Sequence, residues 1–228
     1  MAQYPNSLFV RIADLFYTRL RSLGPMLGTA PSHHIVMENI LYGKASCSAQ
    51  RQKEWETYDL KPIDYFYPER DIAGGALAPK SVKNRLVDKF EDKARVSIEE
   101  KEDLVGILVQ DTRILQEANA VDYSLFLVRY PYPRLGADEG TVPSPPGRTS
   151  PWRSGIVSRD GKWVYRAVLL DFFWAKDALQ AKALTGLVKS WNFFQRGKGN
   201  GPMSITTTAM EYRERFLKMV EVIVEAEA

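Results

Sequence analysis

The sequence predicts an α+β fold in which helices pack on an antiparallel sheet. Apolar residues recur from Leu104 onward at the spacing of one helix face. Thr208 and Glu211 have the spacing of a capping box, which predicts the start of a last helix. Between these segments, Asp-Gly at 160–161 separates two apolar runs, and this pattern is a strong signal of a β-hairpin.

The composition limits the possible classes of protein. The chain has 228 residues, of which 45% are hydrophobic, so it can form one large domain or two small lobes with a real core. Its net charge of +3 does not indicate a nucleic-acid partner, and none is expected. The basic excess lies in the second half, which favours an anionic partner such as a phosphate or a lipid headgroup. A solvated basic face is the alternative.

Cysteine content and hydropathy point to a cytoplasmic protein. The single cysteine, Cys47, excludes a disulfide framework and fits a reducing compartment. No run of residues is long and apolar enough to be a membrane span, so any membrane contact is expected to be peripheral.

The first third of the chain combines short apolar runs with loops. Residues 5–20 are apolar with scattered charges and fit either a helix or a strand. Residues 34–41 are expected to form a buried strand that runs into a linker. Residues 42–55 are polar and are expected to be loose, whereas 57–61 is a candidate strand. The prolines and glycines of 62–79 predict a long loop.

The middle of the chain leads to the first residue of chemical interest. Residues 80–103 are rich in balanced charges and predict a solvated helix or connector. The helix that follows has one apolar face, formed by Leu104, Ile107, Leu108 and Leu115. It leads to Asp122 and then to a β-rich strand at 123–130. Residues 131–153 are rich in proline and predict a flexible loop.

The last third begins with the hairpin, whose strands are expected at 155–158 and 162–170. The second strand ends at Asp171. A helix is predicted over 177–189, followed by an aromatic, basic and glycine-rich stretch over 190–202. The apolar face of the last helix is predicted to consist of Tyr212, Phe216, Met219, Val220 and Ile223.

Asp122 and Asp171 are the best candidates for catalytic residues, because each lies beside an apolar, strand-like run. Two carboxylates held at strand ends can hold a metal–phosphate and orient a hydroxyl, which is what phosphoryl transfer requires. The order of strand, helix, aspartate, strand, hairpin, aspartate and helix is that of the larger lobe of a kinase-like fold. The protein-kinase His-Arg-Asp signature is absent, and Leu127 stands where that signature has asparagine.

Five short segments occur in an order that resembles a known family. They are His-Ile-Val-Met-Glu-Asn at 34–39, Tyr-Asp-Leu-Lys at 58–61, Val-Asp-Tyr-Ser-Leu at 121–125, Leu-Leu-Asp at 169–171, and Ser-Ile with Glu-Tyr-Arg-Glu-Arg-Phe-Leu within 204–217. Together they resemble the hinge strand, the Asp-Leu-Lys-Gly-Ser, Met-Asp-Tyr-Ser-Leu and Ile-Ile-Asp motifs, and the C-terminal signature of the phosphatidylinositol phosphate kinases. The resemblance implies one domain over 1–228 with the larger lobe of the phosphatidylinositol phosphate kinase and SAICAR synthase-like fold.

The resemblance also implies roles for single residues. Asp122 would be the catalytic aspartate that orients an inositol hydroxyl and accepts its proton, and Asp171 would hold Mg²⁺ against the phosphates of ATP. Lys61 would face those phosphates or the lipid headgroup, and Met37 and Asn39 of the hinge segment would contact the nucleotide. On the residues alone, each aspartate could be a turn or cap residue, and Lys61 could be exposed to solvent.

The resemblance also assigns a lipid-binding role to residues 189–198. The stretch from Lys189 to Lys198, which includes Trp191 and Arg196, would replace the activation loop that selects a phosphoinositide and touches an anionic membrane surface. Packing of its aromatic residues onto a core is the alternative.

The chain departs from the family pattern at two places. The family carries a glycine-rich loop and an ATP-binding lysine before the hinge, but here the first glycine is Gly24 and the first lysine is Lys44. The resemblance therefore predicts a domain truncated before the hinge. Pro62-Ile63 stands where the family has Gly-Ser.

Three functions remain open from the sequence. The first is a lipid kinase that uses ATP and Mg²⁺ to phosphorylate a phosphoinositide. The second is a catalytically inactive relative that binds a protein or an anionic membrane. The third is a soluble α+β binding module that matches the motifs by chance.

Overall fold

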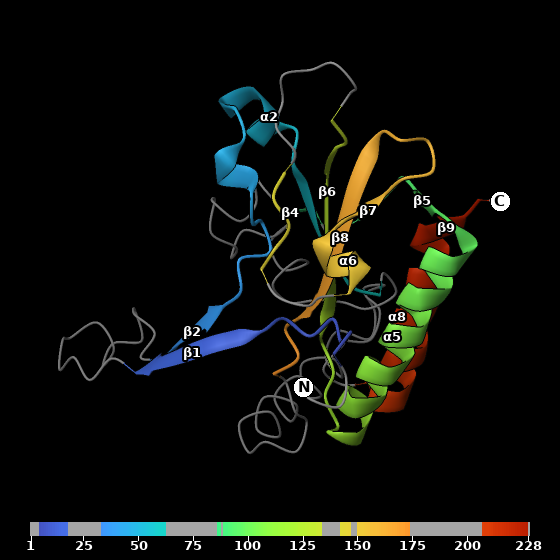
Figure 1. Cartoon of the computed structure of the whole chain (residues 1–228). Coiled ribbons are helices and arrows are strands. Elements are labelled where there is room, and N and C mark those ends of the chain that lie inside the picture. The colour runs from blue at the N-terminus through green and yellow to red at the C-terminus, as the bar shows by residue number, and fades with distance from the viewer. Residues whose placement is uncertain are drawn as a thin grey trace, which may run out of the picture.

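The computed structural model describes residues 5–17, 33–62, 86–87, 89–133, 142–146, 150–173 and 207–227. Figure 1 shows a central sheet beside two long helices, α5 (Ile98–Glu117) and α8 (Ala209–Ile223), which lie side by side. The mixed α+β fold with antiparallel pairing and packed helices is therefore confirmed. The segments predicted at 177–189 and 190–202 lie outside the described residues.

The main sheet has five strands in the order β4-β3-β6-β8-β7. Their bounds are Leu86–Val87 for β4, Glu56–Leu60 for β3, Ser124–Pro131 for β6, Trp163–Leu170 for β8 and Ile156–Val157 for β7. The pairs β3–β6, β6–β8 and β7–β8 are antiparallel, whereas β4 joins β3 in parallel. The predicted strands at 57–61, 123–130 and 162–170 are thus confirmed within one or two residues.

The Asp-Gly hairpin forms as predicted between β7 and β8. The Ser158 hydroxyl accepts hydrogen bonds from the backbone N–H groups of Lys162 (3.1 Å) and Trp163 (2.9 Å) and donates one to Asp160 (2.6 Å). Gly161 has φ 66°, a left-handed conformation that glycine adopts without steric cost. These local bonds fix the register of β8, which carries Asp171 at its far end.

The two long helices bury the faces that their sequences predict. Helix α5 begins six residues before Leu104, where Ser97 and Glu100 form a capping box. The Thr208 side chain caps α8 by accepting a hydrogen bond from the Glu211 N–H (3.1 Å). The buried residues of the two helices include Leu104, Ile107, Leu108 and Leu115 from α5 and Tyr212, Phe216, Val220 and Ile223 from α8. Met219 is partly buried against the same core. Each large apolar side chain buried in this way contributes about 1.5–3 kcal/mol.

Several short elements differ from the expectations. Residues 42–55 contain the 3-10 helix η1 (Lys44–Ser46) and helix α2 (Ala49–Lys53), so this stretch is not loose. The Ser48 side chain caps α2, and Trp55 stacks on Tyr130 with ring centroids 4.1 Å apart. Side-chain capping and packing therefore order a segment whose composition is polar.

Within 80–103, the connector contains strand β5 (Ala94–Val96), which pairs in parallel with β9 (Val224–Ala226). The pairing joins segments that are far apart in the sequence. A run of three residues is too short to show a periodicity, so no sequence pattern predicts β5.

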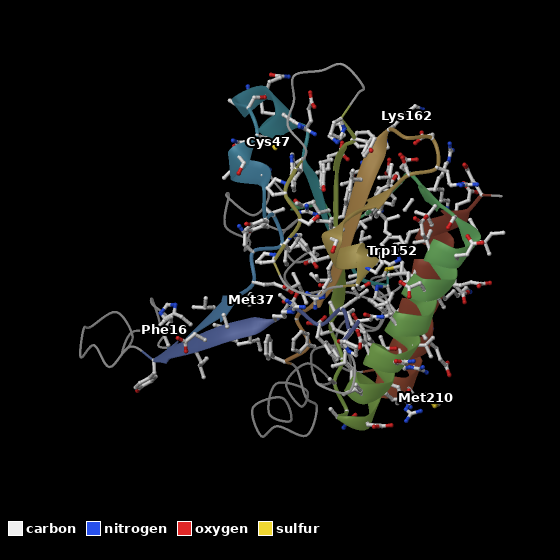
Figure 2. All side chains as sticks on the ribbon, in the orientation of Figure 1. Phe16, Met37, Cys47, Trp152, Lys162 and Met210 are labelled. Carbon is white, nitrogen blue, oxygen red and sulfur yellow. The ribbon has the colours of Figure 1, made fainter. Side chains whose placement is uncertain are left out.

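The stretch 131–153, for which a flexible loop is expected, contains helix α6 (Pro151–Ser154) at its C-terminal end. Pro151 stands in the first turn of the helix, where its missing N–H has no intrahelical role, and the Ser150 side chain caps it. The Trp152 side chain, labelled in Figure 2, is fully buried. Its indole N–H donates to the Glu100 carbonyl of α5 (2.9 Å). Packing against α5 therefore fixes this end of the stretch.

Strands β1 (Ile12–Tyr17) and β2 (His33–Met37) form an antiparallel hairpin that projects from the sheet (Figure 1). Within the described part of 5–20, this decides the ambiguity in favour of a strand over 12–17. The strand expected within 34–41 is present as β2, but the expectation that it is buried is wrong, because Ile35, Val36 and Met37 are exposed. Figure 2 shows Phe16 and Met37 on this hairpin, away from the core. The pairing that forms a strand does not require either face to be covered.

The residues before the hairpin, 7–11, form what we call the N-terminal strap. The Val10 N–H donates to the Leu169 carbonyl (3.0 Å) and the Leu169 N–H donates to the Leu8 carbonyl (2.7 Å), so the strap runs beside the end of β8. The Leu8 N–H donates to the buried carboxylate of Asp111 on α5 (2.7 Å). Arg153 donates to the carbonyls of Ser7 and Phe9. The strap therefore ties α5, α6 and β8 together.

The buried Asp111 gives the stability of the fold a specific pH dependence. Burial raises the pKa of Asp111, while the hydrogen bond from Leu8 and the charge of Arg153 act in the opposite direction. Because the pKa is higher in the folded state, Asp111 contributes an unfavourable free energy above that pKa, and this contribution disappears as the pH falls through it. We expect the free energy of unfolding of Asp111→Asn, minus that of the wild type, to rise as the pH increases from about 4, the usual pKa of an aspartate, through the raised pKa of the folded state.

Asp160→Asn is the matched control for this measurement by urea unfolding. The Ser158 hydrogen bond lowers the pKa of Asp160 to about 2, so Asp160 contributes stability that is lost as the pH falls from about 4 towards 2. The free energy of unfolding of Asp160→Asn, minus that of the wild type, should therefore fall as the pH rises from about 2 to about 4. If the free-energy difference between Asp111→Asn and the wild type does not depend on pH, the Asp111 carboxyl has the same pKa in the folded and unfolded states.

Candidate active site

Three charged residues lie at one edge of the main sheet, because three neighbouring strands begin or end there. Leu60 of β3 pairs with Leu125 of β6, and Ser124 of β6 pairs with Leu170 of β8. Since β6 is antiparallel to both neighbours, the C-terminal ends of β3 and β8 meet its N-terminal end. Lys61 follows β3, Asp122 precedes β6 by two residues, and Asp171 follows β8, so the register alone brings the three together.

The side chains of these three residues converge. Lys61 Nζ lies 3.4 Å from Asp122 Oδ1 and 3.5 Å from Asp171 Oδ2. The exposed fraction of the side chain is 14% for Lys61, 17% for Asp122 and 54% for Asp171. One ammonium thus bridges two carboxylates, and the three groups together carry one excess negative charge. The half-exposed Asp171 is the most open of the three to a ligand.

Both aspartates have unusual backbones. Asp122 has φ 69° and Asp171 has φ 58°, in the left-handed region, which aspartate tolerates better than most residues. Such conformations persist only where the surrounding structure fixes them, and they occur frequently at functional sites. One left-handed residue lies just before β6 and the other just after β8, at the edge of the sheet where the carboxylates meet.

The surroundings of Asp171 include the N-terminal strap. Phe9 of the strap packs edge-on against Phe172, with ring centroids 4.9 Å apart, and Leu169 is hydrogen-bonded to the strap on the other side of Asp171. No sequence pattern predicts this contact, because it joins segments from the two halves of the chain. The strap is thus part of the support of the candidate site.

The other candidate residues lie elsewhere. Met37 pairs with Ile12 at the base of the β1–β2 hairpin, and the exposed Asn39 accepts a hydrogen bond from the Leu41 N–H (3.1 Å). The candidate lipid-binding residues Lys189, Trp191, Arg196 and Lys198 lie outside the described residues. Of the candidates that are described, the structure therefore brings together Lys61, Asp122 and Asp171.

The donor set is compatible with Mg²⁺. No group of three or more His, Cys, Asp or Glu in the described part of the chain is arranged to hold a metal ion. However, Mg²⁺ is commonly held by one or two carboxylates together with water and substrate phosphates, and Asp122 and Asp171 provide that number. The position of the Lys61 ammonium between them shows that the pair accommodates a positive charge.

Comparison with known protein families shows to which family the chain belongs. A family model for phosphatidylinositol-4-phosphate 5-kinase matches residues 1–140, more than half of the chain. The chain belongs to the phosphatidylinositol phosphate kinase family. The matched residues of this phosphatidylinositol phosphate kinase relative include Lys61 and Asp122, whereas Asp171 lies beyond them. No curated protein matches the chain.

Membership of the phosphatidylinositol phosphate kinase family implies a kinase-like fold. It also suggests an ATP-dependent lipid kinase activity, with Mg²⁺ as the cofactor and a phosphoinositide as the substrate. Among the helices that the structure describes, none combines the length and the apolar character needed to cross a bilayer.

Proposed function

We propose that this chain transfers the γ-phosphoryl group of ATP to an inositol hydroxyl of a phosphatidylinositol phosphate. Lys61, Asp122 and Asp171 form the reaction centre in this proposal. The observation that supports it most directly is the bridge from the Lys61 ammonium to both carboxylates, at the ends of three neighbouring strands of a phosphatidylinositol phosphate kinase relative. The sheet with α5 and α8 corresponds to the larger lobe of the kinase-like fold.

Asp122 acts on the inositol hydroxyl, which accepts the phosphoryl group. Its carboxylate orients the inositol hydroxyl and takes its proton as the hydroxyl oxygen forms a bond to the γ-phosphorus. The bond from that phosphorus to the bridging oxygen breaks at the same time, and ADP leaves with the electron pair. A carboxylate that is mostly shielded from water suits this step, because its position is defined before the substrate arrives.

Asp171 and Lys61 act on the phosphates. Asp171, the more exposed carboxylate, would hold Mg²⁺, which when bound neutralises charge on the phosphate oxygens. Lys61 exchanges a carboxylate partner for a phosphate oxygen when the nucleotide binds. Pro62 offers no backbone N–H to a phosphate, so the Lys61 side chain carries the positive contact at this position.

Residues outside this cluster complete the proposal. Met37 and Asn39 of the hinge segment contact the nucleotide, and Lys189, Trp191, Arg196 and Lys198 contact the lipid headgroup and the anionic membrane surface. The protein would then act in the cytoplasm, bound peripherally to membranes.

A labelled-phosphate assay tests the proposal. The purified chain is incubated with Mg²⁺, γ-labelled ATP and vesicles that contain phosphatidylinositol 4-phosphate, beside Asp171→Ala and Asp160→Ala variants. We expect labelled lipid from the wild type and from Asp160→Ala, whose substitution lies in the β7–β8 turn, and only background from Asp171→Ala. Background-level product from the wild type would overturn the proposal.

Vesicle co-sedimentation of the same samples distinguishes the inactive relative. Binding that rises with the content of anionic lipid and falls with salt, without any product, would favour a non-catalytic membrane-binding role.

A further inference from the structure

We propose that Tyr212 of α8 is a positioning residue for Asp122, and that its hydroxyl fixes the peptide between Tyr123 and Ser124, one residue beyond the proposed catalytic aspartate. The inference rests on the proposed role of Asp122. Tyr212 lies ninety residues after Asp122 in the chain. Its sequence pattern indicated an apolar helix face and a segment that resembles the C-terminal signature of the family, but no contact with Asp122.

The contact between α8 and the site is direct and fully buried. The Tyr212 hydroxyl donates a hydrogen bond to the Tyr123 carbonyl (2.5 Å), and both residues have no exposed surface. The Tyr123 ring meets the rings of Tyr212 and Phe216 edge-on, with centroids 4.7 Å and 5.0 Å apart. Helix α8 therefore holds both the carbonyl and the ring of the residue next to Asp122.

Asp122 needs such support because of its backbone. Its φ of 69° is held between Val121 and Tyr123, which are both fully buried. A left-handed residue other than glycine keeps its conformation only when the groups on either side of it are fixed. The Tyr123 carbonyl belongs to the first peptide of β6, so the bond from Tyr212 fixes the point at which the chain leaves the left-handed turn.

Helix α8 is itself anchored, so it can transmit this restraint. The Arg213 guanidinium donates to the Thr112 hydroxyl (3.1 Å) and to the Val109 carbonyl (3.1 Å) of α5. Helix α8, which holds Tyr123, is thus fixed to α5, which leads to Asp122. The hydrogen bond from the Tyr212 hydroxyl connects this pair of helices to the backbone beside Asp122.

Tyr212→Phe removes the hydroxyl and keeps the ring, so the packing against Tyr123 is preserved. Displacements of about 1 Å at a reacting group can reduce a rate by about 10²-fold, and we expect a smaller displacement here and a loss of about tenfold in kcat. The KM for ATP should change little, because the lost hydroxyl acts on the backbone beside Asp122, the residue proposed to act on the inositol hydroxyl.

The matched control is Tyr130→Phe. Tyr130 is also almost fully buried, and its hydroxyl interacts with Arg166, but it lies at the opposite end of β6 from Asp122. The two substitutions remove the same atom from comparable surroundings. They should therefore cause similar changes in Tm, while only Tyr212→Phe should displace Asp122 and lower kcat.

A spectroscopic measurement reports on the site without requiring turnover. In the chain labelled with ¹³C at the lysine ε-carbon, the Lys61 signal is assigned by its loss in Lys61→Arg. Because the Lys61 ammonium contacts Asp122, this signal should shift in Tyr212→Phe and remain in place in Tyr130→Phe.

In an Asp122→Asn background, adding Tyr212→Phe should reduce the remaining rate no further.

The outcomes separate the two proposals. A Tyr212→Phe chain with the kcat and the Lys61 signal of the wild type would overturn the positioning role, even if the chain is an active kinase. An equal loss of rate with and without Asp122 would also overturn it, because a general weakening of the fold acts in both backgrounds. A shifted Lys61 signal in a chain that makes no product would support the positioning role and count against the proposed function alone.

Discussion

An Asp122→Asn chain is expected to transfer phosphoryl groups about 10²–10⁴-fold more slowly than the wild type, the usual cost of losing a positioned general base. Asparagine has nearly the same shape as aspartate and also tolerates a left-handed backbone, so it preserves the turn at φ 69°. It cannot accept the proton of the inositol hydroxyl, and it removes one of the carboxylates that Lys61 contacts. The loss should appear in kcat with little change in the KM for ATP.

Steady-state kinetics with phosphatidylinositol 4-phosphate vesicles check this expectation, and circular dichroism establishes that the variant is folded. Asp122→Ala is the less informative change, because alanine disfavours a positive φ and would disturb the backbone as well. An Asp122→Asn chain with the kcat of the wild type would show that another group accepts the proton.

Replacing Arg153 by alanine is expected to lower the free energy of unfolding by about 3–5 kcal/mol, the usual cost of breaking a buried ion pair by removing one partner. The Arg153 guanidinium is almost fully buried and donates to the carbonyls of Ser7 and Phe9 and to the Glu38 carboxylate. It therefore holds the chain on both sides of the β1–β2 hairpin. Alanine leaves these three acceptors without the guanidinium and loosens the strap beside Asp171.

Urea unfolding at neutral pH measures this loss. Arg113→Ala is the matched control, since Arg113 forms an exposed pair with Glu117 on α5 (3.2 Å) and should cost less than about 0.5 kcal/mol. Equal losses for the two variants would mean that the Arg153 network adds no more than a surface ion pair.

Local sequence patterns predicted the elements that depend on nearby residues. The hairpin around Asp160-Gly161 and the apolar faces of α5 and α8 were correct, because a tight turn and a helix face are determined within a few residues. The same reasoning failed for the exposure of β2 and for the end of the 131–153 stretch. Exposure depends on whether another segment covers a strand, and α6 is ordered by its packing against α5.

The sequence by itself predicted the α+β class, a resemblance to the phosphatidylinositol phosphate kinases and two candidate aspartates, because periodicity and short motifs are local properties of the chain. Only the tertiary structure decided that Lys61 lies between those aspartates and that Tyr212 reaches the backbone beside Asp122. These contacts join β3, β6, β8 and α8 across long stretches of chain. Their geometry comes from the strand register and from the packing of α8 onto the core. The periodicity of α8 predicts which face is buried, but not which residues of the sheet that face meets.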